Sequence, residues 1–578
     1  MNSFLTDSYL TQCGCIHAGH FVFVQRWAEL FDPATIDSYS VKLRNSHGIL
    51  REIKDVILQV NEGQVQSINL DDLVMEGRSL VERDPCIKSH DSALLGAILS
   101  GLKKVERDKP STIVHLGYRV GYALDVLDRN YFNWITQDLL ESICRVPTSS
   151  DESENSQRVA ETLVLTNLLA SEVVGRGWSP RSLSRLGRLI WKKGPKDFDS
   201  RWKEFIERVT QTQEEFEVFF PVTDSNAVEF LRTFNVSAVD GASIIDEFPL
   251  TRRQVSRERL YIKESIHHFP DDLNAAAWAA KSRYDRYRGI SRYYGLELSP
   301  ARDAIVRLPT GNVTKYEFQR TPSRHNLIFN APSDLLSNEI YKPVLSAVGQ
   351  FLWATEAASL EVKYVSLWFA LESLVLTRHH ESNIGHIKAV VPAILCSRYL
   401  DRLLSTFLDD CSNVGVKISY KHQPLSTTDS QLLLQLLRDK DETEYALLYE
   451  ACSSFSLLQA RAMSLRNSVK TNNDLEKTLK RHHEGIAWHL QRLYRLRNNV
   501  VHSGSTGGEA LTEELANHLE FYLCSIIDEI TRRLSHGGYS SVGELLSKLE
   551  DNYVVTVNLL KDNVSLDALV LLGGPLFQ

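Results

Sequence analysis

The sequence predicts a mainly α-helical protein whose N-terminal and middle regions also contain strands and whose C-terminal region is entirely helical. Two observations favour this fold class. Beyond about residue 332, apolar residues recur at steps of three and four, which is the period of an amphipathic helix. Between about residues 212 and 331, short runs rich in β-branched and aromatic residues alternate with polar stretches, as is typical of strands.

The chain has 578 residues, which is too long for a single hydrophobic core. The segment PTSSDESENSQ, residues 147–157, is Ser-rich and acidic and is therefore interpreted as a linker. We expect three regions: a mixed α/β region over 1–146, a middle α+β region over 158–331 with a sensory or regulatory role, and a helical region with a C-terminal extension over 332–578.

Individual elements follow from local pattern. In the first region, HFVFVQRW is a short apolar run, IKDVILQV resembles a strand, and SALLGAILSGLKKV resembles a helix. In the second, RVAETLVLTNLLASEVV and PRSLSRLGRLIWKK predict helices, as does DLNAAAWAAKSRYDRYRGISRYYG. The strand candidates there are EEFEVFFPV, RLYIKES and NLIFNAP.

Three long helices with apolar stripes are predicted in the third region. Their stripes consist of Leu360, Tyr364, Leu367, Leu371 and Leu374 in the first helix; Ile486, Leu490, Leu493 and Val500 in the second; and Leu511, Leu515, Leu519, Tyr522, Ile526 and Ile530 in the third. The second helix is expected to run from about Gly485 to His502. A loop rich in glycine, SGSTGGE, separates it from the third.

Steps of three and four along the apolar stripe of the second helix lead from Leu493 to Arg497, which precedes Val500. A guanidinium there costs several kcal/mol unless it finds a partner or faces a cavity or interface. It could reach the surface, pair with a core carboxylate such as Glu372, or face a groove where an anion binds. Arginine suits phosphate because its planar fork donates two parallel hydrogen bonds. His502 adds a side chain that exchanges a proton near neutral pH, and Asn498 can orient either group.

Arg497 and His502 are five residues apart, and side chains at this spacing point about 140° away from each other on a straight helix. Two arrangements would let them converge. His502 could lie beyond the end of the helix, because Ser503-Gly504 is a stop signal. Alternatively, two copies of the chain could pair their helices around a two-fold axis.

These residues resemble the HEPN superfamily, whose signature is Arg, a polar residue, three further residues and His. Arg497-Asn498-Asn499-Val500-Val501-His502 matches this signature without a gap. The upstream segments YVSLWFALESLVL and SNIGHIKAVVPAIL are similar to consecutive helices of the ApeA-like HEPN branch. The resemblance covers roughly residues 335–535.

The resemblance implies a helical domain that forms a homodimer or higher homo-oligomer and cleaves RNA without metal, by attack of a ribose 2′-hydroxyl on the adjacent phosphate. Arg497 would then stabilise the scissile phosphate, His502 would act as general acid or base or hold the phosphate as a cation, and Asn498 would position both. Glu372 would support Arg497.

Basic residues near this motif favour an RNA partner, with tRNA as one candidate. The stretch from Arg461 to His502 holds nine Lys or Arg against Asp474, Glu476 and Glu484. A solvated helical face is the alternative interpretation. Candidate RNA contacts in and outside this stretch are Lys480, Arg481, Arg492 and Arg495, and Arg286 and Arg288 from the Arg/Tyr-rich segment SRYDRYRGISRYYG.

Composition excludes several classes of protein. The net charge of −8 argues against non-specific coating of nucleic acid, and no apolar run has the length of a membrane helix. We expect a cytoplasmic protein with free thiols, because the eight cysteines show no disulfide framework and no signal peptide is visible. Cys13, Cys15, His17 and His20 lack a second ligand pair at finger-like spacing, so we expect no metal and no cofactor.

Two functions remain open from the sequence. The first is an endoribonuclease effector of bacterial anti-phage defence, of the abortive-infection type, whose N-terminal part restrains it until a trigger arrives. A phage component is one candidate for that trigger. The second is a non-catalytic HEPN module that dimerises or holds RNA and regulates a partner. Loss of RNA degradation in a His502→Ala variant would separate the two.

Overall fold

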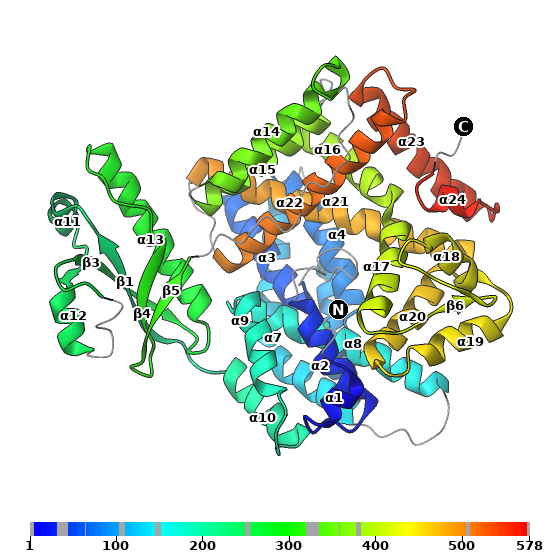
Figure 1. Cartoon of the computed structure of the whole chain (residues 1–578), viewed down its shortest axis with the longest axis horizontal. Coiled ribbons are helices and arrows are strands. Elements are labelled where there is room, and N and C mark those ends of the chain that lie inside the picture. Colours follow the sequence, from blue (N-terminus) through cyan, green and yellow to red (C-terminus); the bar gives the residue numbers. More distant parts are fainter. Residues whose placement is uncertain are drawn as a thin grey trace.

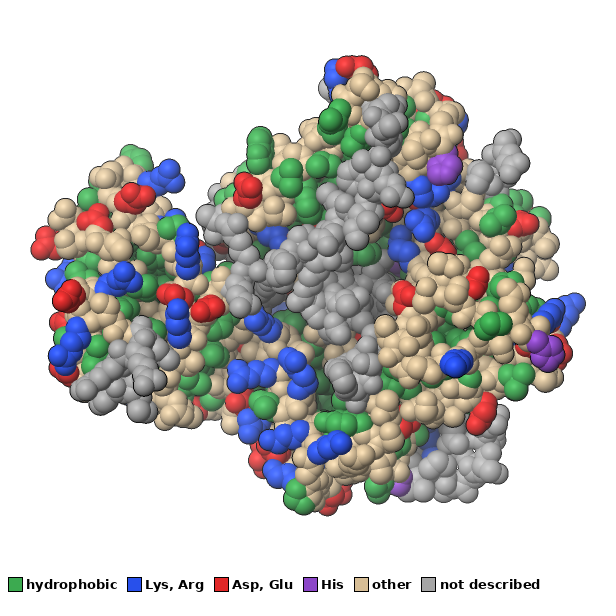
Figure 2. Space-filling view, viewed as in Figure 1, with side chains coloured by type: hydrophobic (Ala, Val, Ile, Leu, Met, Phe, Trp, Pro, Cys, Tyr) green, Lys and Arg blue, Asp and Glu red, His purple; other side chains and the backbone are tan. Residues whose placement is uncertain are grey.

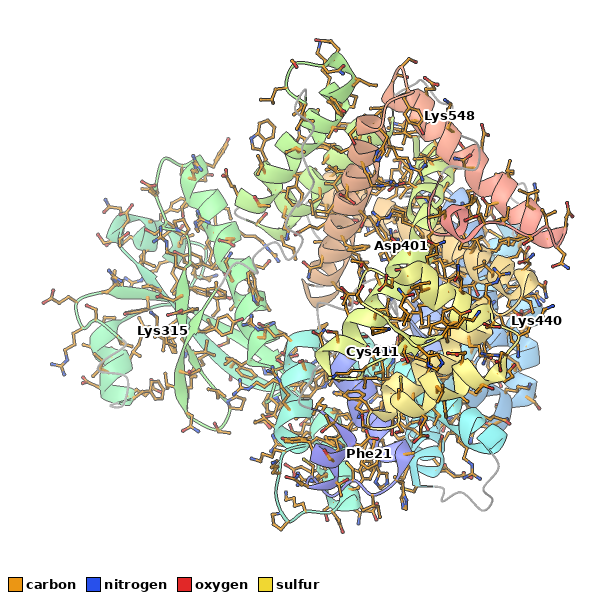
Figure 3. The ribbon with its side chains drawn as sticks, turned by 45° about the vertical axis from the view of Figure 1, so that its right-hand side comes forward. Phe21, Lys315, Asp401, Cys411, Lys440 and Lys548 are labelled. Atoms are coloured by element: carbon orange, nitrogen blue, oxygen red, sulfur yellow. The ribbon has the colours of Figure 1, made fainter. Side chains whose placement is uncertain are left out.

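The computed structural model describes residues 5–31, 44–63, 65–102, 110–144, 152–248, 255–318, 335–357, 359–376, 383–503 and 509–574. The chain is mostly helical, with an antiparallel sheet in the middle of the sequence. The N-terminal and C-terminal parts pack together into a helical body, and a smaller unit that contains the sheet lies to one side (Figure 1). From a second angle, Lys315 marks the sheet unit, apart from the helix that carries Asp401 and Cys411 (Figure 3).

The N-terminal unit is helical. One hydrophobic core runs through it from Leu10 to Val209. Its helices are α1 (Asp7–Thr11), α2 (Ala18–Leu30), α3 (Ser46–Asn61), α4 (Ile68–Glu82), α5 (Pro85–His90), α6 (Ser92–Gly101), α7 (Pro110–Cys144), α8 (Glu152–Gly175), α9 (Pro180–Ile190) and α10 (Phe198–Val209). Several begin at a side-chain cap: Asn45 accepts a hydrogen bond from the amide of Gly48, and Asp84 precedes Pro85 at the start of α5.

The expected strand IKDVILQV is wrong, because these residues lie in α3. Its buried residues follow helical spacing: Ile49, Leu50, Ile53, Val56 and Ile57. HFVFVQRW lies in α2, and among the described residues up to 209 there is no strand. Short apolar runs with β-branched residues fit a strand and a buried helix equally well, so the mixed α/β prediction for 1–146 is corrected to helical for the residues of this range that the structure describes.

The predicted linker at 147–157 does not separate two structural units. Residues 145–151 lie outside the described residues, but α8 starts at Glu152 and packs against α2 and α7 within the same core. The architecture changes after α10 instead, close to residue 210, where the sheet begins.

The middle unit contains an antiparallel sheet, five-stranded within the described residues, in the order β2-β3-β1-β4-β5. Its elements are β1 (Glu214–Val222), α11 (Ser225–Arg232), β2 (Ala238–Asp240), α12 (Gly241–Glu247), β3 (Leu260–His268), α13 (Leu273–Tyr293), β4 (Asp303–Arg307) and β5 (Val313–Glu317). The predicted strands EEFEVFFPV and RLYIKES are confirmed as β1 and β3, and the predicted helix as α13. NLIFNAP lies outside the described residues.

Alternation along β1 places its residues on two faces. Phe216, Val218 and Phe220 pack under α11 and α13, whereas Phe219 packs on the opposite face with α12. The unit joins the helical body through Asp272, the cap of α13. Its carboxylate accepts hydrogen bonds from the amide nitrogen and the hydroxyl of Ser179, at 2.6 and 2.7 Å.

The C-terminal unit is almost entirely helical. Its elements are a 3₁₀ turn (Glu339–Tyr341), α14 (Lys342–Glu356), α15 (Leu360–Val375), α16 (Asn383–Ser397), α17 (Tyr399–Asn413), the two-residue strands β6 (Ser419–Tyr420) and β7 (Gln423–Pro424), α18 (Ser430–Arg438), α19 (Glu442–Ala451), α20 (Ser456–Val469), α21 (Asn472–Ser503), α22 (Glu509–Ser535), α23 (Val542–Lys561) and α24 (Ala568–Leu571). One core joins α14, α15, α16, α21, α22 and α23, and a second lies among α17, α18 and α20.

The N-terminal and C-terminal units are tied together by buried polar contacts. The Asp7 carboxylate accepts hydrogen bonds from the amide and hydroxyl of Ser456 at the start of α20. Arg461 pairs with Glu29 of α2 and with Asp410 of α17. A further group of contacts joins α3 and α4 to α21, the helix that carries the Arg497 motif.

No helix in the described ranges is both long enough and apolar enough to cross a bilayer.

Candidate functional site

Helix α21 carries the Arg-Asn…His motif on a long, well-anchored scaffold. It begins at Asn472, further upstream than predicted, after Thr471, whose hydroxyl accepts a hydrogen bond from the Asp474 amide. The predicted stripe of Ile486, Leu490, Leu493 and Val500 is confirmed as part of the core. On α15 the predicted stripe is buried from Tyr364 to Leu374, and Leu360 is partly buried; on α22 it is buried from Leu515 to Ile530.

Arg497 is half-buried on this stripe, between Leu493 and Val500. One terminal nitrogen, Nη1, donates a hydrogen bond to Oδ1 of Asn498 at 3.2 Å. The Nε atom is buried and makes no hydrogen bond within the described residues. The guanidinium carbon lies 5.8 Å from the ring centroid of Phe369 on α15, at the outer limit of a cation–π contact. A buried N–H without an acceptor costs free energy, so Arg497 has unused donor capacity.

Three contacts fix α15 against α21. The Tyr364 hydroxyl donates to the backbone oxygen of Leu493 at 2.6 Å, and the rings of Trp368 and Tyr494 lie 5.8 Å apart. The third contact is the one between Phe369 and Arg497. In these three contacts the residue numbers increase together along α15 and α21, so the contacting segments of the two helices are parallel.

Glu372 is half-buried on α15, one turn beyond Phe369, which places it alongside the last turns of α21. No hydrogen bond or ion pair joins its carboxylate to Arg497 or to another basic side chain in the described part of the chain. The expected pair between Glu372 and Arg497 is therefore not formed, and Asn498 is the residue that contacts the guanidinium.

The backbone of His502 belongs to α21, which continues to Ser503. The side chain of His502 lies outside the described residues. Because the helix does not end before His502, the first of the two arrangements that would bring Arg497 and His502 together is excluded. Positions five residues apart on one straight helix diverge by about 140°, so the second arrangement, across two copies of the chain, is the one that the helical backbone leaves open.

Arg492 and Arg495 face the N-terminal unit, not an RNA strand. Nε of Arg492 donates to both carboxylate oxygens of Glu52 on α3, at 2.9 and 3.1 Å, and its Nη2 donates to Glu76 on α4 at 2.8 Å. Nη2 of Arg495 also donates to Glu52. Both arginines are buried, at 4% and 7% exposure, so their predicted contact with RNA does not agree with this structure.

The charges of this cluster stabilise one another. Burial alone would raise the pKa of Glu52, but the neighbouring Arg492, Arg44 and Arg495 hold it well below its ordinary value. Burial alone would lower the pKa of Arg492, but Glu52 and Glu76 raise it above its ordinary value. Glu52 and Arg492 are therefore charged at neutral pH, and the ion pairs of this cluster clamp α21 to α3 and α4 next to the motif.

Most of the basic excess predicted around the motif is neutralised in the same way. Arg466 and Lys470 pair with Glu442, and Lys480 pairs with Glu476 on its own helix. Arg481 is exposed on α21, far along the helix from Arg497. The local count of charges therefore overstates the positive surface available to RNA, because most of the paired carboxylates come from distant parts of the sequence.

The two candidates on α13 differ from each other. Arg288 donates to the backbone oxygen of Leu298 at 3.2 Å and pairs with Asp285 at 3.0 Å, so it has a structural role. Arg286 is exposed and makes no hydrogen bond or ion pair within the described residues. Only Arg286 is free to contact a ligand.

Exposed apolar side chains lie on α15 and α21 near Arg497, a feature that the sequence pattern does not indicate. Phe369 is 42% exposed, and Val362, two turns before it on the same face of α15, is also exposed. Val501, one turn after Arg497 on α21, is exposed as well. Figure 2 shows hydrophobic side chains gathered over α14 and α15 at the upper edge of the helical body. An apolar stripe in the sequence predicts which side chains are buried, but it does not show which adjacent apolar side chains remain exposed to solvent.

Within the described residues there is no group of three or more His, Cys, Asp or Glu side chains that could hold a metal ion. Comparisons with protein-family models, with curated proteins and with solved structures find no match to this chain.

Proposed function

We propose that the C-terminal helical unit is a HEPN-like ribonuclease domain and that the protein is a metal-independent endoribonuclease. The observation that carries this proposal is Arg497: a half-buried guanidinium that bonds, within the described residues, only to its neighbour Asn498. Its terminal nitrogens keep donor capacity for an anionic ligand such as a phosphate. The order of the helices α15, α16 and α21 along the chain supports the same assignment.

The chemistry follows from the residue types. The ribose 2′-oxygen attacks the adjacent phosphorus while the bond to the 5′-oxygen breaks, which leaves a 2′,3′-cyclic phosphate and a 5′-hydroxyl. A base removes the 2′-hydroxyl proton, an acid protonates the leaving 5′-oxygen, and His502 can take either part. Negative charge accumulates on the phosphate oxygens in the transition state, where the fixed charge and paired donors of Arg497 are most effective.

A composite site between two copies of the chain resolves the divergence of Arg497 and His502. In a two-fold dimer the same face of each copy meets its equivalent, so Arg497 of one α21 can approach His502 of the other. The exposed Val362 and Phe369 on α15 and Val501 on α21 support this arrangement, because a second copy would remove them from water.

We further propose that the protein acts in the cytoplasm as an antiviral toxin of the abortive-infection type, with the N-terminal and middle units as restraint or sensor. The clamp from Glu52 and Glu76 to Arg492 gives the N-terminal unit direct contact with the helix that carries the motif. The alternative function, a non-catalytic dimerising module, is favoured by one observation: most basic residues of α21 and its surroundings are already paired within the chain.

The test uses purified full-length protein, a mixed RNA substrate and EDTA. We expect the wild type to leave 2′,3′-cyclic phosphate and 5′-hydroxyl ends. Arg497→Ala should lower the rate by about 10² to 10³, and Arg497→Lys should also fail substantially because lysine loses the two-pronged geometry. Arg185→Ala, an exposed arginine on α9, is the matched control and should cleave normally. If the double variant Arg497→Ala/His502→Ala cleaved RNA at the wild-type rate, the catalytic assignment would be wrong. The non-catalytic dimerising module would then take its place.

A further inference from the structure

The outer end of the sheet unit carries four aromatic side chains in one connected row. Ring centroids lie 5.1 Å apart between Phe234 and Phe230, 4.9 Å between Phe230 and Tyr294, and 5.3 Å between Tyr294 and Tyr293. Phe234, Tyr294 and Tyr293 are 53%, 60% and 85% exposed. Solvent-exposed aromatic side chains in mutual contact make a patch that is typical of a binding surface.

The row is held in place by the ends of two helices. Asn235 follows the end of α11 with a φ of 61°, and Gly295 follows the end of α13 with a φ of 77°. In both turns, backbone amides bond back to the last helical carbonyls: Asn235 to Arg232 at 3.0 Å and Gly295 to Arg292 at 3.0 Å. The aromatic residues just before these turns therefore sit on a fixed backbone. This end of α13 points away from the helical body (Figure 1).

Three arginines border the row. Arg232 and Arg292 lie in the last turns of α11 and α13, and Arg286 lies two turns before Tyr293 on the same face of α13. All three are exposed, and no ion pair or hydrogen bond engages their side chains in the described residues. Figure 2 shows hydrophobic and basic side chains side by side at this end of the unit.

The electrostatics are modest, because exposed Glu229 and Glu297 lie in the same segments and the helix C-termini carry partial negative charge. Arg232 and Arg292 offset those dipoles, which leaves Arg286 as the main unbalanced cation. Binding at this end must therefore rest mainly on the aromatic rings, with a smaller contribution from the arginines.

We propose that this end of the sheet unit binds single-stranded nucleic acid, with bases stacked on Tyr293, Tyr294 and Phe234 and phosphates held by Arg286 and its neighbours. Stacking on aromatic side chains tolerates any base sequence, and arginine supplies both charge and a flat surface for the backbone. This inference does not depend on the proposed ribonuclease activity, because it concerns a different unit and requires no cleavage.

The probe is a fluorescein-labelled 12-nucleotide oligouridine with 2′-O-methyl riboses, which has no free 2′-hydroxyl and cannot be cleaved by the proposed reaction. Its anisotropy is measured against full-length protein in 50 mM salt. Tyr293→Ala/Tyr294→Ala should raise the Kd by about tenfold or more, since each stacked base contributes substantially. Arg286→Ala/Arg292→Ala should raise the Kd by a smaller factor. It should also make the slope of log K against log salt shallower by about 1.4.

The matched control is Tyr118→Ala/Tyr122→Ala on α7, where two equally exposed tyrosines show no ring contact with each other in the described structure. It should bind as the wild type does. A duplex of the same length should compete poorly, and oligothymidylate in a second arm shows whether the site distinguishes RNA from DNA.

Two results would overturn the proposal: no binding of either single strand by the wild type up to about 100 µM, the weak limit of non-specific affinity, or unchanged binding by the tyrosine variant. The first result would indicate a protein partner for this patch. Because all the substituted side chains are exposed, the variants should unfold at the wild-type temperature. Neither binding result changes what the cleavage assays with the Arg497 variants test, because those assays concern the proposed ribonuclease activity.

Discussion

Replacing Glu52 with alanine should release the clamp between the N-terminal unit and α21. Its carboxylate accepts hydrogen bonds from Arg492 at 2.9 and 3.1 Å and from Arg495, and Arg44 lies 3.6 Å away. Removing one partner of a buried ion pair leaves an uncompensated charge and typically costs about 3 to 5 kcal/mol. Arg492 keeps Glu76 at 2.8 Å, so we expect a loss near the lower end, about 3 kcal/mol.

The assay is urea unfolding followed by circular dichroism. The matched control is Glu82→Ala, which breaks a pair with Arg78 at 3.0 Å whose side chains are 46% and 47% exposed. An exposed pair of this kind contributes about 0 to 1 kcal/mol. If Glu52→Ala is no less stable than Glu82→Ala, the clamp does not hold α21 and our interpretation of Arg492 and Arg495 is refuted.

The difference in stability between the wild type and Glu52→Ala should depend on pH in a defined direction. The folded pKa of Glu52 is held below the value in the unfolded chain, about 4.3, so its stabilisation is fully present above that pH. It is lost as pH falls further toward the folded pKa. The gap in stability between wild type and Glu52→Ala should therefore narrow below about pH 4.

Three further outcomes are expected. Burial lowers the pKa of His20 and His483 to about 4. The folded protein therefore binds fewer protons than the unfolded chain between about pH 4 and 6.5, so stability should rise with pH over this range. Replacing both histidines with glutamine should flatten that rise in urea titrations. Tyr364→Phe should lower stability by about 0.5 to 1.5 kcal/mol, through loss of its buried hydrogen bond to α21. Arg288→Ala should lower the melting temperature of the sheet unit whereas Arg286→Ala should not; equal effects would contradict the roles assigned to them.

Elements with strong periodicity could be predicted from the sequence. The stripe through Leu490 and Leu493 indicated α21, and the aromatic and β-branched residues of EEFEVFFPV indicated β1. IKDVILQV alone is too short to separate the two periods, and helical spacing becomes visible only when the upstream Ile49 and Leu50 are included.

The site could be predicted only in part. The register of Arg497 on an apolar stripe left its surroundings open, and the structure shows its side chain half-buried. The clamp could not be inferred, since Glu52 and Arg492 are 440 residues apart and no local pattern links them. The same limit explains why counting basic residues along α21 overstated its positive surface: a count of neighbours in sequence omits the carboxylates that the fold brings from elsewhere.

The composite site is the central claim, and a mixed dimer tests it most directly. Arg497→Ala and His502→Ala chains with different tags are co-expressed, and dimers that contain one of each are purified through both tags. If each site takes Arg497 from one copy and His502 from the other, one of the two sites is intact, and the mixed dimer should cleave RNA at about half the wild-type rate. A mixed dimer as inactive as either variant alone would contradict the account.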